Sequence, residues 1–479
     1  MPLYWSVVAL GVYALVVLWI SPRRVSVRQF FDASSADGAA PRIWLLAVSA
    51  AVSWIMAKSI NNAIDLSAAY GFWGGAGYAA YWLSFIVAGV VIYGLRTAGG
   101  YTSLTQFLTH RYGAAATKAF LVVIVIRLFN EVWSNTKVTA LFFGTEGSGL
   151  YWAAALGFTA LTLYYSWRGG LRSSILTDGF QMLLLGVLAV LVGVVLIPGF
   201  RESGWPTVAS GQVTPAMQAG GLTFLALALV QIFSYPFHDP VLTDRAFIND
   251  PGRMLRAFVL AGLLGGGVIL LLSLVGLYAL SGGLGSEPSA MVAVARSLGL
   301  GMMLIFNVIM MLSAGSTLDS TFSSTAKFAA RDWPARFDAP DTGQVRLGRR
   351  AMLIMALLGN LPLLSLYIDG IGPAVIAATT ISGTAVMGLA PIFILARMRN
   401  ANPFSFHFAF WPGVVLGLIK LLEDFLGWQL QPAWMTLGQG GYATTLGLNV
   451  YGVALCTLGF LVGNRVGVML PAAGRTTES

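Results

Sequence analysis

The stretch Ser313-Ala-Gly-Ser316-Thr317-Leu-Asp319-Ser320 lies within residues 301–327, a segment otherwise apolar enough to cross a bilayer. At about 100° per residue, its hydroxyl residues share one stripe of a helix and Asp319 lies beside them. Hydroxyls and a carboxylate on one face suit a hard cation. Hydroxyls can also simply pack membrane helices together, but a carboxylate at bilayer depth costs roughly 2.5–3.5 kcal/mol and needs a partner or a function. The stretch therefore predicts a cation site, with helix packing as the alternative for the hydroxyls.

The composition around this stretch is that of an integral membrane protein. The chain has 479 residues, of which 57% are hydrophobic and 10% charged, whereas soluble domains carry about 25% charged residues. The one cysteine and three scattered histidines indicate neither a disulfide framework nor a His/Cys metal cluster. Basic cytoplasmic loops account for the net charge of +9. We therefore expect the lipid bilayer as a partner, and no nucleic acid.

Apolar runs of about 17–25 residues mark the predicted spans. They lie at 4–20, 43–64, 74–95, 119–143, 150–166, 175–197, 220–236, 257–281, 301–327, 350–367, 373–397, 404–422 and 443–464. We therefore predict an all-α integral membrane protein with about 13 transmembrane helices. The first run lacks a preceding basic residue and is followed by Arg23 and Arg24, the reverse of a secretory signal. This pattern predicts a multi-pass protein of the cytoplasmic (inner) membrane, N-terminus outside and C-terminus inside.

The basic residues support this topology, because cytoplasmic connections are enriched in Lys and Arg. Most Lys and Arg residues, Arg245 among them, lie in connections predicted to be cytoplasmic. The exceptions are Arg201, Arg296 and Lys420 in outer connections and Lys58, Arg127 and Lys137 within spans.

The spans after the first form two sets of five with opposite orientation, which is the inverted-repeat plan of many secondary transporters. No sequence repeat supports this division, which rests on the helix count. We assign residues 1–40 to a leading helix and loop, 41–198 to the first repeat, 219–398 to the second, and 399–479 to two additional helices and a tail. The first helix of each repeat is interrupted, by polar residues within 43–64 and by Pro236 and Pro240. In such folds the broken helices carry the sites.

Several segments, taken in order, resemble the sodium:solute symporter family, which includes the proline, sialic acid and glucose/galactose symporters. The segments are 101–113, 168–181 with its glycine pair leading to Thr177-Asp178 and Gln181, 240–245, and the opening stretch followed by Ala329-Ala-Arg331-Asp332-Trp333. Together they span roughly residues 25–400, and their order makes the resemblance specific. It implies a leucine-transporter-like fold with a 5+5 inverted repeat.

The resemblance also implies a sodium ion between the interrupted helix 43–64 and helix 301–327, held by carbonyls of the former and hydroxyls of the latter. Some members bind a second sodium through the acid of the Thr-Asp signature. The matching residues here are Val52, Ile55, Ser313, Ser316 and Thr317 for the first site, and Asp178, Asp319 and Ser320 for a second. For Asp178 the alternative is a charge at a helix N-terminus near the cytoplasm.

Lys58 departs from the family, whose members have small or hydroxyl residues there. Two interpretations stay open. Lys58 pairs with Asp319 or Asp178 as a buried ion pair, or it is a fixed cation that replaces a sodium ion and makes transport sodium-independent or proton-coupled.

Arg127 stands where the family contacts its solute, and its guanidinium would hold a carboxylate in bidentate fashion. Alternatively, Arg127 and Glu131 neutralise one another at i and i+4. The segment 74–82 lacks the polar groups that sugar transporters use, and Trp54 replaces the acid of the proline branch. The candidate solute-binding residues are Ser53, Lys58, Arg127, Asn130, Glu131, Gln231, Phe233 and Tyr235.

The sequence therefore predicts a secondary active transporter, a monomer in our working expectation, that couples Na+ to uptake of a small solute. A carboxylate-bearing solute, such as an amino acid or organic acid, is expected. A transporter-like membrane sensor is the alternative from another class, although we find no soluble signalling domain. An enzyme is not expected, because we find no nucleophile–base pair and no phosphate-binding loop.

Overall fold

The computed structural model describes residues 3–285, 289–337, 341–367 and 382–469, and this part of the chain is helical with no β-strand. The first half contains α1 (Leu3–Ile20), α2 (Val27–Asp32), α3 (Ile43–Trp54), α4 (Ala57–Tyr70), α5 (Phe72–Ala80), α6 (Leu83–Gly99), α7 (Leu104–Ala140) and α8 (Gly149–Ser203). The second half contains α9 (Pro215–Gln231), η1 (Tyr235–His238), α10 (Pro240–Arg245), α11 (Pro251–Ser281), α12 (Ala290–Ser297), α13 (Leu300–Lys327), η2 (Phe328–Asp332), α14 (Thr342–Leu358), η3 (Leu361–Tyr367), α16 (Ser382–Ala385), α17 (Leu389–Ile394), α18 (Pro403–Leu426), η4 (Ala433–Met435) and α19 (Ala443–Met469).

The long helices agree with the predicted spans once their breaks are considered. By length and composition, nine helices among the described residues can cross a membrane, or ten when the bent pair α3 and α4 is one span. Helix α8 has 55 residues, about 80 Å at 1.5 Å per residue, whereas a bilayer core is about 30 Å thick. Its backbone breaks at Gly170, where φ is 52°, so α8 provides the two spans predicted at 150–166 and 175–197. The predicted span 373–397 lies partly outside the described residues.

The interruption predicted in the first helix of the first repeat is present as a bend of 63° between α3 and α4. No proline or glycine lies at this bend; Ile55 leaves the helix with φ −76° and ψ 67°. Breaking a helix frees backbone carbonyls, which inside a membrane need other donors. Hydroxyls of α13 supply them: Ser313 donates to the Ile55 carbonyl and Thr317 to the Ser53 carbonyl at 3.3 Å. The bend and α13 therefore stabilise each other.

The second interruption follows α9, where Pro236 and Pro240 limit the chain to the short helices η1 and α10. Asp239 lies between them and caps α10, its Oδ1 accepting the Leu242 N–H at 3.3 Å. The two interruptions pack together, since α10 contacts both α3 and α13.

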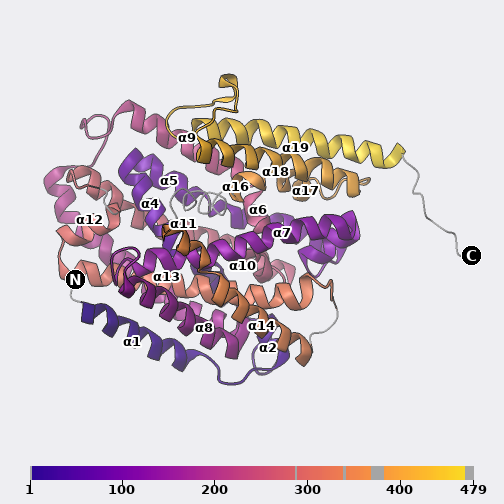
Figure 1. The fold of residues 1–479 in the computed structure, drawn as a ribbon, viewed down its shortest axis with the longest axis horizontal. Helices are drawn as coiled ribbons and strands as arrows, with labels where there is room; N and C mark the ends of the chain where they lie inside the picture. The colour runs from indigo at the N-terminus through magenta and orange to yellow at the C-terminus, as the bar shows by residue number, and fades with distance from the viewer. Residues whose placement is uncertain (1–2, 286–288, 338–340, 368–381, 470–479) are drawn as a thin grey trace, which may run out of the picture.

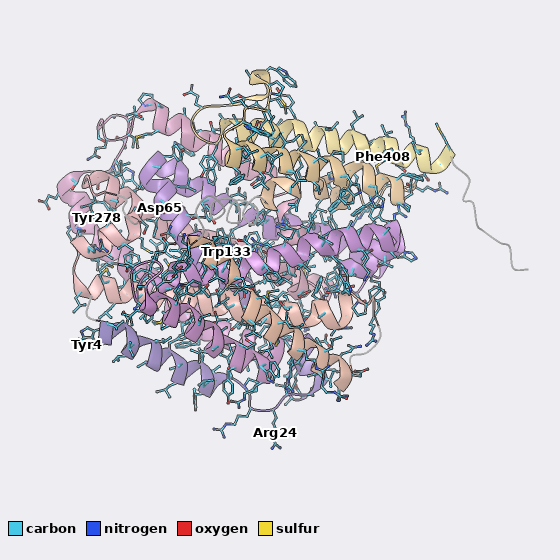
Figure 2. The ribbon with its side chains drawn as sticks, viewed as in Figure 1. Tyr4, Arg24, Asp65, Trp133, Tyr278 and Phe408 are labelled. Carbon is cyan, nitrogen blue, oxygen red and sulfur yellow. The ribbon has the colours of Figure 1, made fainter. Side chains whose placement is uncertain are left out.

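The remaining helices enclose this core. Figure 1 shows α18 and α19 side by side along one edge of the molecule and α1 along the opposite edge, with α13 and α8 between them. In Figure 2, Arg24 projects outward from the loop after α1, whereas Asp65 lies among the central helices. Helices α11 and α4 approach closely at Gly276, where a Cβ atom would lie 2.0 Å from the Ile64 carbonyl oxygen. A glycine is therefore required at this crossing.

Candidate cation and solute sites

Of the residues predicted to hold the first sodium ion, Ile55, Ser313 and Thr317 meet at the contact between the α3 bend and α13, whereas the Val52 carbonyl accepts the Ile55 N–H at 3.1 Å within the bend. Ser313, Thr317, Val52 and Ile55 are fully buried. Besides the bonds to the bend, Thr317 Oγ1 lies 3.1 Å from the Ser313 carbonyl. Carbonyl and hydroxyl oxygens that converge from two helices are the donor set that suits a hard monovalent cation. The residues present therefore fit a sodium ion at this contact.

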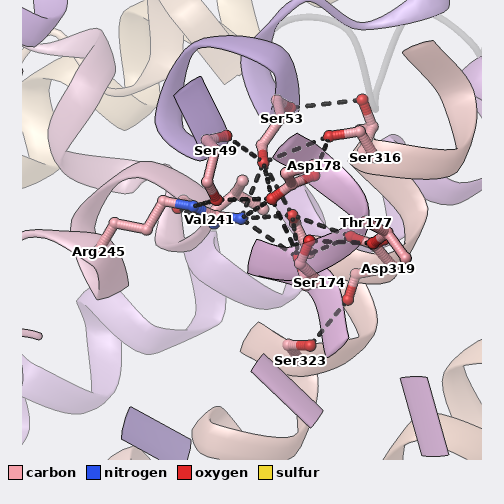
Figure 3. Close-up of polar contacts among 12 residues, drawn as sticks. Ser49, Ser53, Ser174, Thr177, Asp178, Val241, Arg245, Ser316, Asp319 and Ser323 are labelled. Carbon is pink, nitrogen blue, oxygen red and sulfur yellow. Dashed lines mark hydrogen bonds and ion pairs between the residues drawn. The ribbon is translucent and has the colours of Figure 1, made fainter. Parts of the chain in front are cut away.

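A second buried cluster lies one turn further along α13 and extends to α8 (Figure 3). The Asp319 carboxylate accepts hydrogen bonds from Ser174 at 2.7 Å, from Thr177 at 2.9 Å and from Tyr165 at 3.0 Å. The Asp178 carboxylate accepts from Ser316 and from Ser49. Ser316, one helical turn from Ser313 on α13, therefore links this cluster to the first group of residues.

Arg245, counted from the sequence among the cytoplasmic connections, occupies the middle of this second cluster. Its side chain is fully buried, and Nη2 lies 2.8 Å from Ser53 Oγ, 2.7 Å from Ser320 Oγ and 3.1 Å from Asp178 Oδ2. Nε donates to Ser49 Oγ at 2.9 Å. In Figure 3 the guanidinium reaches from α10 into the group of Ser49, Ser53, Asp178 and Ser174. A permanent cation of the chain thus contacts Asp178 and Ser320, two of the residues predicted to bind a second sodium ion.

A third polar cluster joins α4, α7 and the α9–α10 interruption. The Arg127 guanidinium lies 2.6 Å from Glu131 and 2.7 Å from Asp239, and Asp239 also accepts the Trp54 indole N–H at 2.9 Å. Lys58 Nζ lies 2.9 Å from Glu131. The expected pairing of Lys58 with Asp319 or Asp178 is therefore wrong, and the sequence alternative in which Arg127 and Glu131 neutralise each other is the arrangement found. The two cations, Lys58 and Arg127, and the two carboxylates, Glu131 and Asp239, give this cluster no net charge.

A cavity of about 720 Å³ opens next to this cluster, within the size range of small-molecule sites. Its aromatic lining consists of Trp54, Tyr70, Tyr78, Tyr81, Trp82, Phe224, Tyr235 and Tyr442. Its polar lining consists of Lys58, Ser59, Asn62, Asp65, Gln231, Thr384 and Thr445. Gln231 is fixed by Tyr81, which donates to its Oε1, and by Asn449 at 3.2 Å.

The predicted solute-binding residues divide into two groups around this cavity. Lys58, Gln231 and Tyr235 line it. The lining does not include Ser53, which bonds Arg245, or Arg127, Asn130 and Glu131, which are at most 3% exposed, or Phe233, which is 44% exposed. The residues of this second group do not reach the cavity in this conformation, and their contact with a solute stays a prediction.

The cavity opens toward the side of the chain that the sequence topology places outside, because Tyr442 lies in the connection between α18 and α19. Ion pairs lie at the other end of α13, on the side that the sequence topology predicts to be cytoplasmic. Lys327 Nζ lies 2.6 Å from Asp244 and 3.1 Å from Asp332, and Arg331 lies 3.4 Å from Asp32. A smaller cavity of about 170 Å³ lies beside these ion pairs, so the wider opening is the cavity next to Lys58.

Arg245 and Asp239 were the residues missed from the sequence. Asp239 lies between the two prolines of the second interruption and Arg245 follows them, and positive-inside counting treats an arginine after a span as a loop residue. The proline pair itself is the local signal, because a turn between broken helices can return into the core.

The chain matches no protein-family model and no curated protein sequence. Solved structures do match it. A Na+-coupled sialic acid symporter, in a substrate-bound outward-open state with a novel Na+ site, is 14% identical with a TM-score of 0.66, over 97% of each chain. MHP1, a nucleobase-cation-symport-1 family transporter in a closed conformation with bromovinylhydantoin bound, is 13% identical with a TM-score of 0.54, over 95% of this chain and 97% of that one. At these identities the likeness establishes the leucine-transporter-like fold, as the sequence predicted.

Proposed function

We propose that the protein is a secondary active transporter of the cytoplasmic membrane, related to the sodium:solute symporters, that couples sodium entry to uptake of a small organic solute. The observation that carries this proposal is the contact between the α3 bend and α13, where Ser313 and Thr317 meet the freed carbonyls of Ile55 and Ser53. The similar solved structures belong to transporters, one of them named as Na+-coupled. Fold alone would not specify the function, whereas this donor set provides a reason for sodium.

Sodium acts in this proposal through differential affinity for two conformations. An ion held between α3 and α13 stabilises the arrangement in which these helices are in contact, which is the arrangement with the cavity open to one side. When the ion leaves, that contact weakens, and the ion pairs of Lys327 with Asp244 and Asp332 can separate to open the other side. The solute and the ion are therefore exposed alternately to the two sides.

In the alternative of a sodium-independent or proton-coupled transporter, Lys58 is a fixed cation close to the residues predicted to bind sodium. Lys58 instead pairs with Glu131, and the cation that lies among those residues is Arg245. We propose that Arg245 takes the place of a second sodium ion, while the first sodium site stays available. One sodium ion would then accompany each solute.

Transport by purified protein in liposomes tests the function. An inward sodium gradient should drive accumulation of the solute, and an equal potassium gradient should not. The Thr317→Ala variant should require more sodium for half-maximal uptake, because it removes one hydroxyl from the donor set. Equal uptake with sodium and potassium, or an unchanged sodium requirement in the variant, contradicts the proposal.

A further inference from the structure

Of the four charged residues in the cluster beside the cavity, only the cation Lys58 reaches the cavity wall. Within the cluster of Lys58, Glu131, Arg127 and Asp239, the Lys58 side chain is 16% exposed and the other three are at most 1% exposed. An ammonium has three N–H donors, and Glu131 is the one side chain found bonded to Nζ among the described residues. Lys58 can therefore donate to an anionic group in the cavity, whereas Arg127 is buried and paired with two carboxylates.

The walls next to Lys58 are aromatic. Trp54 and Tyr235 meet edge to face at 5.7 Å and 77°, and Tyr81 lies 5.7 Å from Tyr235. Tyr78 and Phe224 are stacked at 6.3 Å further along the cavity. Surfaces of this kind favour a flat ring, which can make offset or edge contacts with them. An organic cation would also suit aromatic faces, but the Lys58 ammonium repels it.

Among the described lining residues, no carboxylate stands close enough to Lys58 to pair with the amino group of an α-amino acid. Asp65 is the one carboxylate found in the described lining, and it stands two turns beyond Lys58 on α4, about 10 Å along the axis. Its two oxygens already accept the Ala290 N–H at 3.0 Å and the Asn61 amide at 2.7 Å. A single α-carbon cannot place its carboxylate on Lys58 and its ammonium on Asp65.

We propose that the solute is an aromatic carboxylate without an α-amino group, with its carboxylate on Lys58 Nζ and its ring between Tyr81, Tyr235 and Phe224. This inference rests on the proposed transport function and narrows its substrate class. Lys58 acts as the specificity-determining residue, and Glu131 positions it.

The test is ligand binding to the purified full-length protein, measured by thermal shift and titration calorimetry in sodium and in potassium buffers. The probes share one skeleton: 3-phenylpropanoate, 3-phenylpropan-1-ol and L-phenylalanine, with propanoate to remove the ring. We expect 3-phenylpropanoate to bind about 10- to 100-fold more tightly than the alcohol, which lacks the charge-assisted hydrogen bond. L-phenylalanine and propanoate should bind more weakly as well.

The Lys58→Gln variant should lose the preference for the carboxylate over the alcohol. If that variant does not fold, Lys58→Gln/Glu131→Gln keeps the cluster neutral and serves the same purpose. Lys137→Gln is the matched control, since Lys137 also pairs with a glutamate, Glu146 at 2.7 Å, and does not line the cavity.

Four outcomes are informative. Tight binding of 3-phenylpropanoate that depends on Lys58 supports the inference; if it is equal in sodium and potassium, the inference stands and sodium coupling fails. Equal binding of the alcohol or of L-phenylalanine overturns the inference. Stabilisation of the protein by sodium, without binding of 3-phenylpropanoate, also overturns it and leaves the transport proposal intact.

Discussion

Replacing Arg245 by glutamine should destabilise the protein and at the same time make its stability depend more strongly on sodium. The guanidinium and its partner Asp178 are both fully buried at 3.1 Å, and Asp319 lies in the same cluster. Removing one partner of a buried ion pair leaves the other charge uncompensated and costs about 3–5 kcal/mol. The Arg245→Gln variant should therefore unfold at a clearly lower temperature than the wild type in detergent solution without sodium.

Sodium binding should restore part of the stability that the Arg245→Gln variant loses. In the variant, the oxygens of Ser53, Asp178 and Ser320 no longer face a guanidinium and can accept a cation instead. A ligand at 100 times its Kd stabilises the folded state by about 2.7 kcal/mol, which is of the same size as the loss. The thermal shift between sodium and potassium buffers should therefore be larger in Arg245→Gln than in the wild type.

Two controls separate this effect from general damage. Arg245→Gln/Asp178→Asn removes both charges and should recover stability relative to the single variant, since neighbouring groups of one network couple by about 0.5–3 kcal/mol. Arg253→Gln breaks an ion pair with Asp250 that is more than half exposed, and should have little effect. The reasoning is refuted if Arg245→Gln is as stable as the wild type, or if its sodium response does not increase.

Three further outcomes follow from other parts of the molecule. Thr317→Ala should raise the sodium concentration for half-maximal uptake, whereas Thr321→Ala, whose hydroxyl bonds only its own helix, should not; equal effects would contradict the site. Lys327→Met removes two ion pairs and should increase labelling of a reporter cysteine on the predicted cytoplasmic side; unchanged labelling would show that these pairs do not hold that side. Gly276→Ala should lower stability by about 1–3 kcal/mol through overpacking against α4, and Gly267→Ala on the same helix, with open space at its Cβ, should be neutral or stabilising in thermal unfolding.

The spans and the hydroxyl-bearing face of α13 could be predicted from the sequence because each depends on a local pattern. A run of apolar residues must become a helix in a membrane, and hydroxyls at i, i+3 and i+4 must share a face. The same reasoning located the bend in the helix 43–64, since polar residues in a span need partners. It could not locate Arg245 or pair Lys58, because both depend on which helices meet across the fold.

Arg245 also shows why a topology rule can mislead at a single residue. Positive-inside counting is a statement about averages and assumes that an arginine beyond a span is in water. Here α10 is a short helix of a broken span, so a residue at its end reaches α3 and α8 inside the protein. A proline pair after a span indicates that the next turn can return into the core, and basic residues in such a turn are candidates for buried partners.

The charge balance of the buried clusters gives a reason for one sodium ion. The cluster of Lys58, Arg127, Glu131 and Asp239 is neutral, so it requires no ion from outside. The cluster around α13 has two carboxylates, Asp178 and Asp319, and one guanidinium, so with both acids ionised it has an excess negative charge. Ser316 joins that cluster to the contact between Ser313 and Ile55, where oxygen donors converge. One cation at that contact would neutralise the excess, and a second would create a buried positive charge that no described neighbour balances.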